Sequence, residues 1–128
     1  MTYFFDRSLG RMIPRTLRAS GIDAVAHDSL FAQDTPDDEW LADVGRRGWT
    51  VLTKDDRIRY NEAERQALIT YNVGCFAVMR RNDTREQILA TLEAAWERIE
   101  EIATSEMRPF FYAIHKDGTV HKKDLATK

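Results

Sequence analysis

Short apolar runs alternate along the chain with longer segments in which apolar residues recur every three or four positions. The short runs have the length and composition of strands and predict them over residues 3–5, 22–27, 49–53, 73–79 and 109–115. Helical spacing predicts helices over 11–19, 36–47 and 62–71, and a long helix that ends near 103. Strands separated by helices in this order indicate an α/β domain with a parallel sheet and right-handed crossovers.

Two helix starts carry local patterns. Thr35 is a suitable capping residue, Pro36 suits the first helical position, and the acids that follow complement the helix dipole. Gly48 is the residue type expected just after the end of this helix. Residues 83–86, an aspartate followed three positions later by a glutamate, predict a capping pattern before the long helix.

The 128 residues are enough for one domain with its own core, which we assign to residues 1–120. A turn at 116–118 leads into a short extension. Residues 121–128 are polar and basic, and we expect them to form a flexible tail.

Composition narrows the classes of function. The 19 basic side chains nearly cancel the 21 acidic ones, so no overall basic field points to nucleic acid. Cys75 is the chain's only cysteine and lies in an apolar run, which excludes an internal disulfide and a cysteine-based zinc site. No apolar run approaches the ~20 residues that span a bilayer, and the first residues do not resemble a secretion signal. We therefore expect a cytoplasmic protein without a membrane segment.

Acidic residues follow four successive predicted strands. They are Asp6, then Asp37 and Asp38, then Asp55 and Asp56, and finally Asp83. The carboxyl ends of parallel strands share one edge of the sheet, and ligands of such folds bind beyond that edge. Converging carboxylates are the ligands that Mg2+ and Mn2+ prefer. The sequence therefore predicts a metal site at this edge.

Each acid also has a structural alternative. Asp6 could only organise a turn, Asp55 and Asp56 could lie in a solvated turn, and Asp83 could only cap a helix. Carboxylates at the position of Asp37 and Asp38 stabilise a helix by roughly 0.3–1 kcal/mol without any ligand. Recurrence at a shared edge is what favours a functional site over these alternatives.

Three segments in this order resemble the PIN-like domains related to the ribonuclease toxins of bacterial toxin–antitoxin modules. They are Tyr-Phe-Phe-Asp-Arg-Ser-Leu-Gly at 3–10, Pro-Asp-Asp-Glu-Trp-Leu at 36–41, and Gly-Trp-Thr-Val-Leu-Thr-Lys-Asp-Asp-Arg at 48–57, with Ala-Glu-Arg at 63–65 downstream. The resemblance covers residues 3 to 80. It implies a three-layer Rossmann-like domain, with a mainly parallel sheet of about five strands flanked by helices, and an acidic Mg2+ or Mn2+ site that hydrolyses RNA phosphodiesters.

The resemblance also implies roles for individual residues. Asp6 and Asp55 match acids that hold the metal, and Asp37 matches the acid that opens the second helix and binds the metal directly or through water. One of the three acids would also accept the nucleophile's proton. Asp38 is an alternative to Asp37, and the fourth acid is either Asp56 or Asp83. The hydroxyl of Thr53 would position a ligand or water, or Thr53 is simply a β-branched strand residue.

An RNA substrate also needs cations. The same junctions supply Arg7, Arg11, Lys54, Arg57 and Arg59, and Arg80–Arg81 follows the fourth strand. These side chains would bind phosphates in a salt-sensitive way, or they simply balance the acids. By resemblance, a toxin of this kind has a cognate antitoxin that occludes its acidic cleft or blocks the metal, and such domains often form homodimers.

Two other classes of function stay open. The first is a non-catalytic PIN-like module that binds a protein or RNA partner. The second is a response-regulator-like protein that uses an acidic pocket for Mg2+ and phosphoryl transfer. That class needs a pair of acids after the first strand, whereas Asp6 has no adjacent acid. We expect a metal-dependent endoribonuclease.

Overall fold

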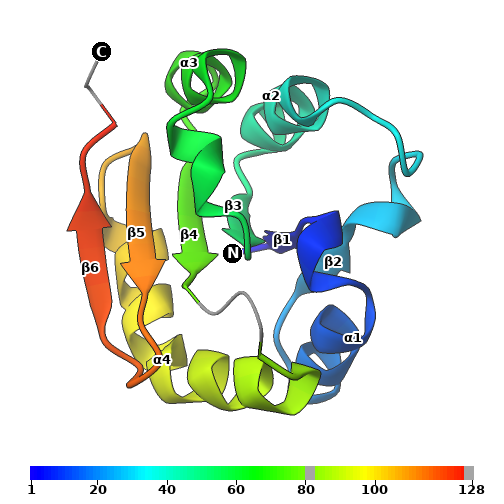
Figure 1. Cartoon of the computed structure of the whole chain (residues 1–128), viewed down its shortest axis with the longest axis vertical. Coiled ribbons are helices and arrows are strands. Elements are labelled where there is room, and N and C mark those ends of the chain that lie inside the picture. Colours follow the sequence, from blue (N-terminus) through cyan, green and yellow to red (C-terminus); the bar gives the residue numbers. More distant parts are fainter. Residues whose placement is uncertain (80–82, 126–128) are drawn as a thin grey trace.

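The computed structural model describes residues 1–79 and 83–125, which form a central sheet with helices on both faces (Figure 1). The strands are β1 (Tyr3–Phe5), β2 (Ala24–Ala26), β3 (Thr50–Thr53), β4 (Gly74–Val78), β5 (Phe110–Ile114) and β6 (Val120–Lys123). The helices are α1 (Met12–Ala19), α2 (Asp37–Arg47), α3 (Glu62–Thr70) and α4 (Arg85–Ser105). Short 3-10 helices follow three of the strands: η1 (Arg7–Leu9), η2 (His27–Ser29) and η3 (Asp56–Arg59).

The sheet has the strand order β2-β1-β3-β4-β5-β6, and its first five strands are parallel. This confirms the α/β prediction of a mainly parallel sheet flanked by helices. The sixth strand is antiparallel to β5 and follows a turn in which Gly118 has a φ of +86°. The side chain of Asp117 accepts the backbone N–H of Thr119 at 3.0 Å and stabilises this turn.

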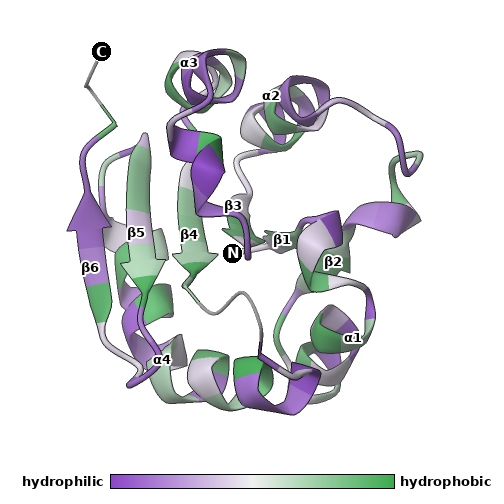
Figure 2. Ribbon diagram, viewed as in Figure 1, coloured by the Kyte–Doolittle hydropathy of each residue, from purple (hydrophilic) through white to green (hydrophobic). Residues whose placement is uncertain are grey.

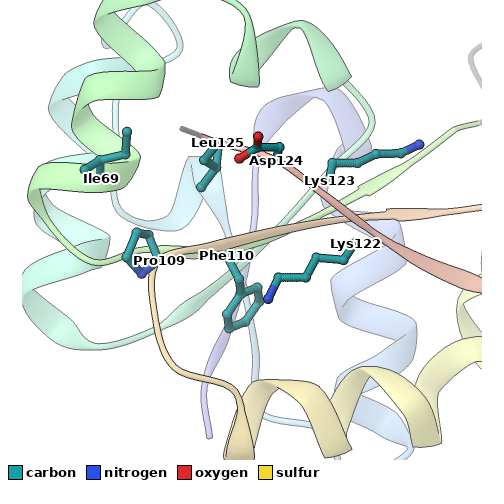
Figure 3. Close-up of a pocket in the computed structure, with 7 residues that line it drawn as sticks. All are labelled: Ile69, Pro109, Phe110, Lys122, Lys123, Asp124 and Leu125. Atoms are coloured by element: carbon teal, nitrogen blue, oxygen red, sulfur yellow. The ribbon is translucent and has the colours of Figure 1, made fainter. Parts of the chain in front are cut away.

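β6 includes part of the segment that we expected to be a tail. Residues 121–123 pair with β5, and Leu125 beyond them is buried. Leu125 helps to line an apolar pocket of about 590 Å³ between α3 and the start of β5 (Figure 3). Figure 2 shows β6 as mostly hydrophilic beside the hydrophobic β4 and β5, as suits an exposed edge strand. Residues 126–128 lie outside the described part of the chain.

Two helix pairs sandwich the sheet. α1 and α4 cover one face, and α2 and α3 cover the other (Figure 1). Neighbouring strand residues alternate between the two cores, so Phe76 faces α1 and α4 while Cys75 faces α2 and α3. Burial raises the pKa of the Cys75 thiol well above its usual range, as expected for a structural cysteine. In the described residues no helix has the length and apolar content needed to cross a bilayer.

The chain changes direction at β1. From β1 it reaches β2 through α1 on one face, and from β2 it passes over the other face through α2 to β3 on the opposite side of β1. Connections that lie on opposite faces of the sheet leave a crevice between the carboxyl ends of the adjacent strands β1 and β3. The residues that follow Phe5 and Thr53 therefore lie on either side of this crevice.

Two predicted helix starts are each displaced by one residue. α2 begins at Asp37, and Pro36 is its capping residue without a side-chain cap bond. α4 is capped by Thr84, whose hydroxyl accepts the N–H of Gln87 at 3.1 Å while the Gln87 side chain accepts the N–H of Thr84 at 2.9 Å. The expected capping pattern at 83–86 is therefore wrong by one position. A threonine hydroxyl with a glutamine three positions later forms the reciprocal pair instead.

Gly45 controls how closely α2 packs against the end of α3. A Cβ atom at this position would lie 2.6 Å from the Cβ and carbonyl oxygen of Tyr71. Both are held by the backbone and cannot easily move. Gly45 therefore allows the close packing that sets the position of α2 relative to α3. These two helices carry Asp37 and Glu64.

Gly45→Ala should lower the free energy of unfolding by about 1–3 kcal/mol because the new methyl group overlaps Tyr71. Alanine is otherwise favoured over glycine in a helix by up to about 1 kcal/mol, so the sign of the change is diagnostic. Urea unfolding measures it. Gln66→Ala at an exposed position of α3 is the control, with an expected change within about 0.5 kcal/mol. A stabilised Gly45→Ala variant would contradict this close approach.

Candidate functional site

The carboxylate of Asp6 is buried at the end of β1. One of its oxygens, Oδ1, accepts the backbone N–H of Ser8 at 2.8 Å and also the Ser8 hydroxyl. The other, Oδ2, accepts the hydroxyl of Thr53 at 2.5 Å. Asp6 is 5% exposed, so these bonds replace most of the water that a carboxylate would otherwise bind.

The same two hydroxyls also hold the end of β3. The backbone N–H of Lys54 donates to the Ser8 hydroxyl at 2.9 Å, and that of Asp55 donates to the Thr53 hydroxyl at 3.0 Å. Of the two alternatives for Thr53, the structure favours a positioning role, because its hydroxyl links Asp6 to the backbone of Asp55.

Burial raises the pKa of Asp6 above its usual value, because a charged carboxylate loses hydration there. The hydrogen bonds from Ser8 and Thr53 oppose this shift, and the negative charge of Asp37 adds to it. Asp6 and Asp37 thus influence each other electrostatically although thirty residues separate them in the sequence.

Asp37 is held by two donors at the start of α2. Its Oδ1 accepts the indole N–H of Trp40 at 2.9 Å and Nη2 of Arg7 at 3.1 Å. The other terminal nitrogen of Arg7, Nη1, donates to the carbonyl oxygens of Gln33 and, at 3.3 Å, Thr35. Arg7 therefore ties the loop before α2 to the end of β1 in addition to facing the site.

Asp55 is engaged by the neighbouring arginine. Nε and Nη2 of Arg57 donate to the two oxygens of Asp55 at 2.8 and 3.0 Å, and the backbone N–H of Arg57 donates at 3.1 Å. Bidentate guanidinium pairs of this kind are the stronger class of charge-assisted hydrogen bond. The guanidinium is exposed, so a ligand can replace it at Asp55.

Three of the predicted acids meet at one cavity of about 550 Å³ at the edge of the sheet. Asp6, Asp37 and Asp55 line it together with Glu64, and Arg7 and Arg57 supply positive charge. The other predicted acids, Asp38, Asp56 and Asp83, do not line this cavity. Asp83 directly precedes the capping residue of α4.

Glu64 is an acid of this cavity that we did not predict. It lies in the first turn of α3, where its backbone N–H donates to the Asn61 side chain at 3.1 Å. Burial raises its pKa to about 7, and Asp37 contributes through a hydrogen bond and through its charge. The Ala-Glu-Arg segment at 63–65, one of those that carry the resemblance, contains Glu64 and is the signal that could have pointed to it.

The predicted RNA-binding cations are arranged less uniformly than the acids. Arg7 and Arg57 line the acidic cavity, whereas Arg11 pairs with Asp28 at 3.4 Å beside it. The guanidinium of Arg59 lies 4.2 Å from the ring centroid of Tyr60, which is largely exposed. Lys54 contributes a backbone N–H to the network around Asp6. Arg80–Arg81 lies outside the described residues.

The donor chemistry of the cavity fits Mg2+ or Mn2+, because all four acids offer oxygen ligands. The raised pKa values of Asp6 and Glu64 have crowded negative charge among their causes, which a cation would neutralise. Within residues 1–79 and 83–125, however, no three acidic, histidine or cysteine side chains are grouped closely enough to hold one ion. Asp6 instead faces two hydroxyls, and Asp55 faces Arg57.

Comparison with known proteins identifies the family. Residues 1–80 match the family described as "PIN like domain". The chain belongs to this family of PIN-like domains. The PIN-like chain is also 32% identical over 122 residues to a protein named "Putative ribonuclease VapC45" from Mycobacterium tuberculosis (strain ATCC 25618 / H37Rv). That match covers 91% of this PIN-like chain and 88% of the relative. No solved structure gives a significant match.

The pKa of Glu64 predicts how the stability of the metal-free PIN-like domain changes with pH. The folded protein holds this proton up to about pH 7, while an unperturbed glutamate loses it near 4.5. The stabilisation from Glu64 is therefore complete below pH 4.5 and is lost as pH rises through 7. The slope of stability against pH should be smaller than the limit of about 1.4 kcal/mol per pH unit for one proton, because Glu64 is partly exposed and water screens its interactions.

Urea unfolding between pH 5 and 8 in EDTA, with wild type and Glu64→Gln, measures this effect. Glu64→Gln should reduce the fall in stability between pH 5 and 7, to which Asp6 with its own raised pKa also contributes, and Glu93→Gln at an exposed position of α4 should leave the fall unchanged. Identical pH profiles for wild type and Glu64→Gln would show that the carboxyl of Glu64 is not shifted.

Proposed function

We propose that this PIN-like domain is a metal-dependent endoribonuclease. The observation that carries the proposal is the meeting of Asp6, Asp37, Asp55 and Glu64, from four separate segments, at one cavity in the crevice beyond β1 and β3. The similarity to a relative named as a ribonuclease supports the same activity.

Asp6 and Asp55 would hold the metal, because they flank the crevice at the ends of the two adjacent strands. Asp37 would bind it directly or through water. Bound Mg2+ or Mn2+ lowers the pKa of a water molecule and neutralises charge on the phosphate. Arg57 and Arg7, at the margin of the cavity, would bind the phosphate oxygens.

Glu64 is the fourth acid of the proposed site, in place of Asp56 or Asp83. Its pKa of about 7 suits a group that accepts a proton from the attacking water at neutral pH. The hydrogen bond that it shares with Asp37 would keep it at the edge of the cavity. Ser8 and Thr53 would hold Asp6 in place.

We further propose that the protein is the toxin of a toxin–antitoxin module that acts in the cytoplasm, and the similarity to a relative named as a ribonuclease supports the nuclease part of this proposal. A cognate antitoxin would then inhibit it by covering the acidic cavity or by displacing the metal. RNA and that antitoxin are its proposed partners, and a homodimer remains an expectation from the family.

A non-catalytic binding module is the second candidate. The observation that favours it is the engagement of Asp55 by Arg57 in a bidentate pair, with no close grouping of three ligands in the described residues. A module of this kind would bind RNA or a protein at the same cavity without cutting.

Cleavage of a mixed RNA pool by purified protein in Mg2+, Mn2+ or EDTA tests the proposal. Cutting should need the metal and should fall at least about 100-fold in Asp55→Asn and in Asp6→Asn, since each variant removes a ligand charge. Asp43→Asn is the matched control, because Asp43 pairs with Arg47 at 2.7 Å on α2 and does not line the cavity.

Wild-type rates in both site variants would overturn the residue assignment. If the protein folds but cuts no RNA in any metal, the non-catalytic module becomes the better account. A thermal shift with Mn2+ that is present in wild type and absent in Asp55→Asn would still locate the metal.

A further inference from the structure

A second cavity of about 340 Å³ adjoins the acidic one and shares Arg7 with it. It lies among η1, η2 and the loop that leads to α2, and its other polar side chains are Arg11, His27, Asp28 and Gln33. Its volume is at the lower end of the range for small-molecule sites, about 300–1,000 Å³. It can hold one nucleotide rather than a stretch of RNA.

His27 in the wall of this cavity lacks hydrogen-bond partners. It is 1% exposed, and neither ring nitrogen has a partner among the described residues. The ring packs against Phe31 and Trp40, at centroid distances of 5.6 and 6.1 Å. A buried polar group without a partner costs about 1–3 kcal/mol. Both ring nitrogens are shielded from the cavity in this conformation, so a polar ligand would supply the missing partner only after the ring has moved toward it.

Arg11 and Asp28 form an adjustable pair beside His27. Their side chains are 77% and 43% exposed and their closest nitrogen and oxygen atoms lie 3.4 Å apart. Exposed pairs of this kind are weak, so they rearrange easily around a ligand. Together they present the donors of a guanidinium next to the two acceptors of a carboxylate.

We propose that this cavity binds one guanine nucleotide of the RNA substrate, next to the phosphate that is cut. The inference rests on the proposed nuclease function. Among the four bases, guanine alone offers two adjacent acceptors, O6 and N7, beside two adjacent donors, N1–H and the N2 amino group. Arg11 would donate to the acceptors, and Asp28 would accept from the donors.

The position of Arg7 connects base recognition with cleavage. Because Arg7 lines both cavities, a phosphate bound at its guanidinium lies between the acidic cavity and the proposed guanine site. His27 would complete the site, since a neutral imidazole can donate one hydrogen bond and accept another. Burial lowers the pKa of His27, so the ring is neutral at pH 7.

Calorimetric titration of the protein in EDTA tests the site without any need for catalysis. The ligands are GMP, AMP, CMP and UMP, and a dinucleotide of two guanosines joined by a phosphodiester. GMP should bind about 5- to 150-fold more tightly than the other mononucleotides, the range for one bidentate contact pair. Asp28→Asn should remove this preference, and Arg98→Ala on the outer face of α4 should keep it.

His27→Phe separates binding from folding. This variant replaces an unsatisfied buried group with an apolar ring, so urea unfolding should show equal or greater stability. Its affinity for GMP should nevertheless fall at least several-fold. Lower stability together with unchanged affinity would overturn the assigned role of His27.

Equal binding of all four mononucleotides, or no binding, overturns the inference. If GMP binds more tightly than the dinucleotide, the site serves a free nucleotide and the inferred RNA subsite is wrong. GMP binding by a protein that cuts no RNA would contradict the proposed nuclease and leave the guanine site in place. Cleavage without preference for guanine at the cut would contradict only the guanine site.

Discussion

The burial of the Asp6 carboxylate is the constraint on which this site depends. A carboxylate out of water is costly unless hydrogen bonds replace the lost hydration, and Asp6 obtains those bonds from Ser8 and Thr53. Since Ser8 follows β1 and Thr53 ends β3, the bonds join the two adjacent strand ends. The Thr53 hydroxyl also accepts the backbone N–H of Asp55, so the position of Asp55 depends on the same hydroxyl that binds Asp6.

The remaining charges are arranged around this centre by the topology of the sheet. The connection that leaves β1 runs through α1 on one face of the sheet, and the connection that enters β3 runs through α2 on the other face. The start of α2 and the start of α3 both reach the crevice between β1 and β3. They bring Asp37 and Glu64 within electrostatic reach of Asp6 and Asp55. The close approach of these negative charges opposes ionisation of the carboxyl groups and lowers the stability of the folded protein. The packing of the two hydrophobic cores must offset this loss.

Much of this arrangement could be predicted from the sequence. The order of the strands in the sheet cannot be read from local sequence patterns. Acids that follow successive strands of a parallel sheet nevertheless share one edge, and this rule alone predicts that Asp6, Asp37 and Asp55 lie close together. Glu64 was missed because a glutamate in a first helical turn is ordinary, and only its neighbours in space shift its pKa. The tie from Arg7 to Gln33 joins residues 26 apart in sequence, and no local pattern contains it.

Arg57 can bind either Asp55 or a phosphate with the same nitrogen donors, so these two interactions compete. Its guanidinium uses two nitrogens to hold Asp55, and a guanidinium engaged in that bidentate pair cannot offer the same donors to a phosphate. Under the proposed function, Asp55 would give its oxygens to a cation, and Arg57 would then be free to bind a phosphate of the substrate. Binding of the cation and binding of phosphate would then be thermodynamically linked, and each would increase the affinity for the other. The pairing of Asp55 with Arg57 is consistent with this proposed linkage, because the pair neutralises both charges in the protein alone.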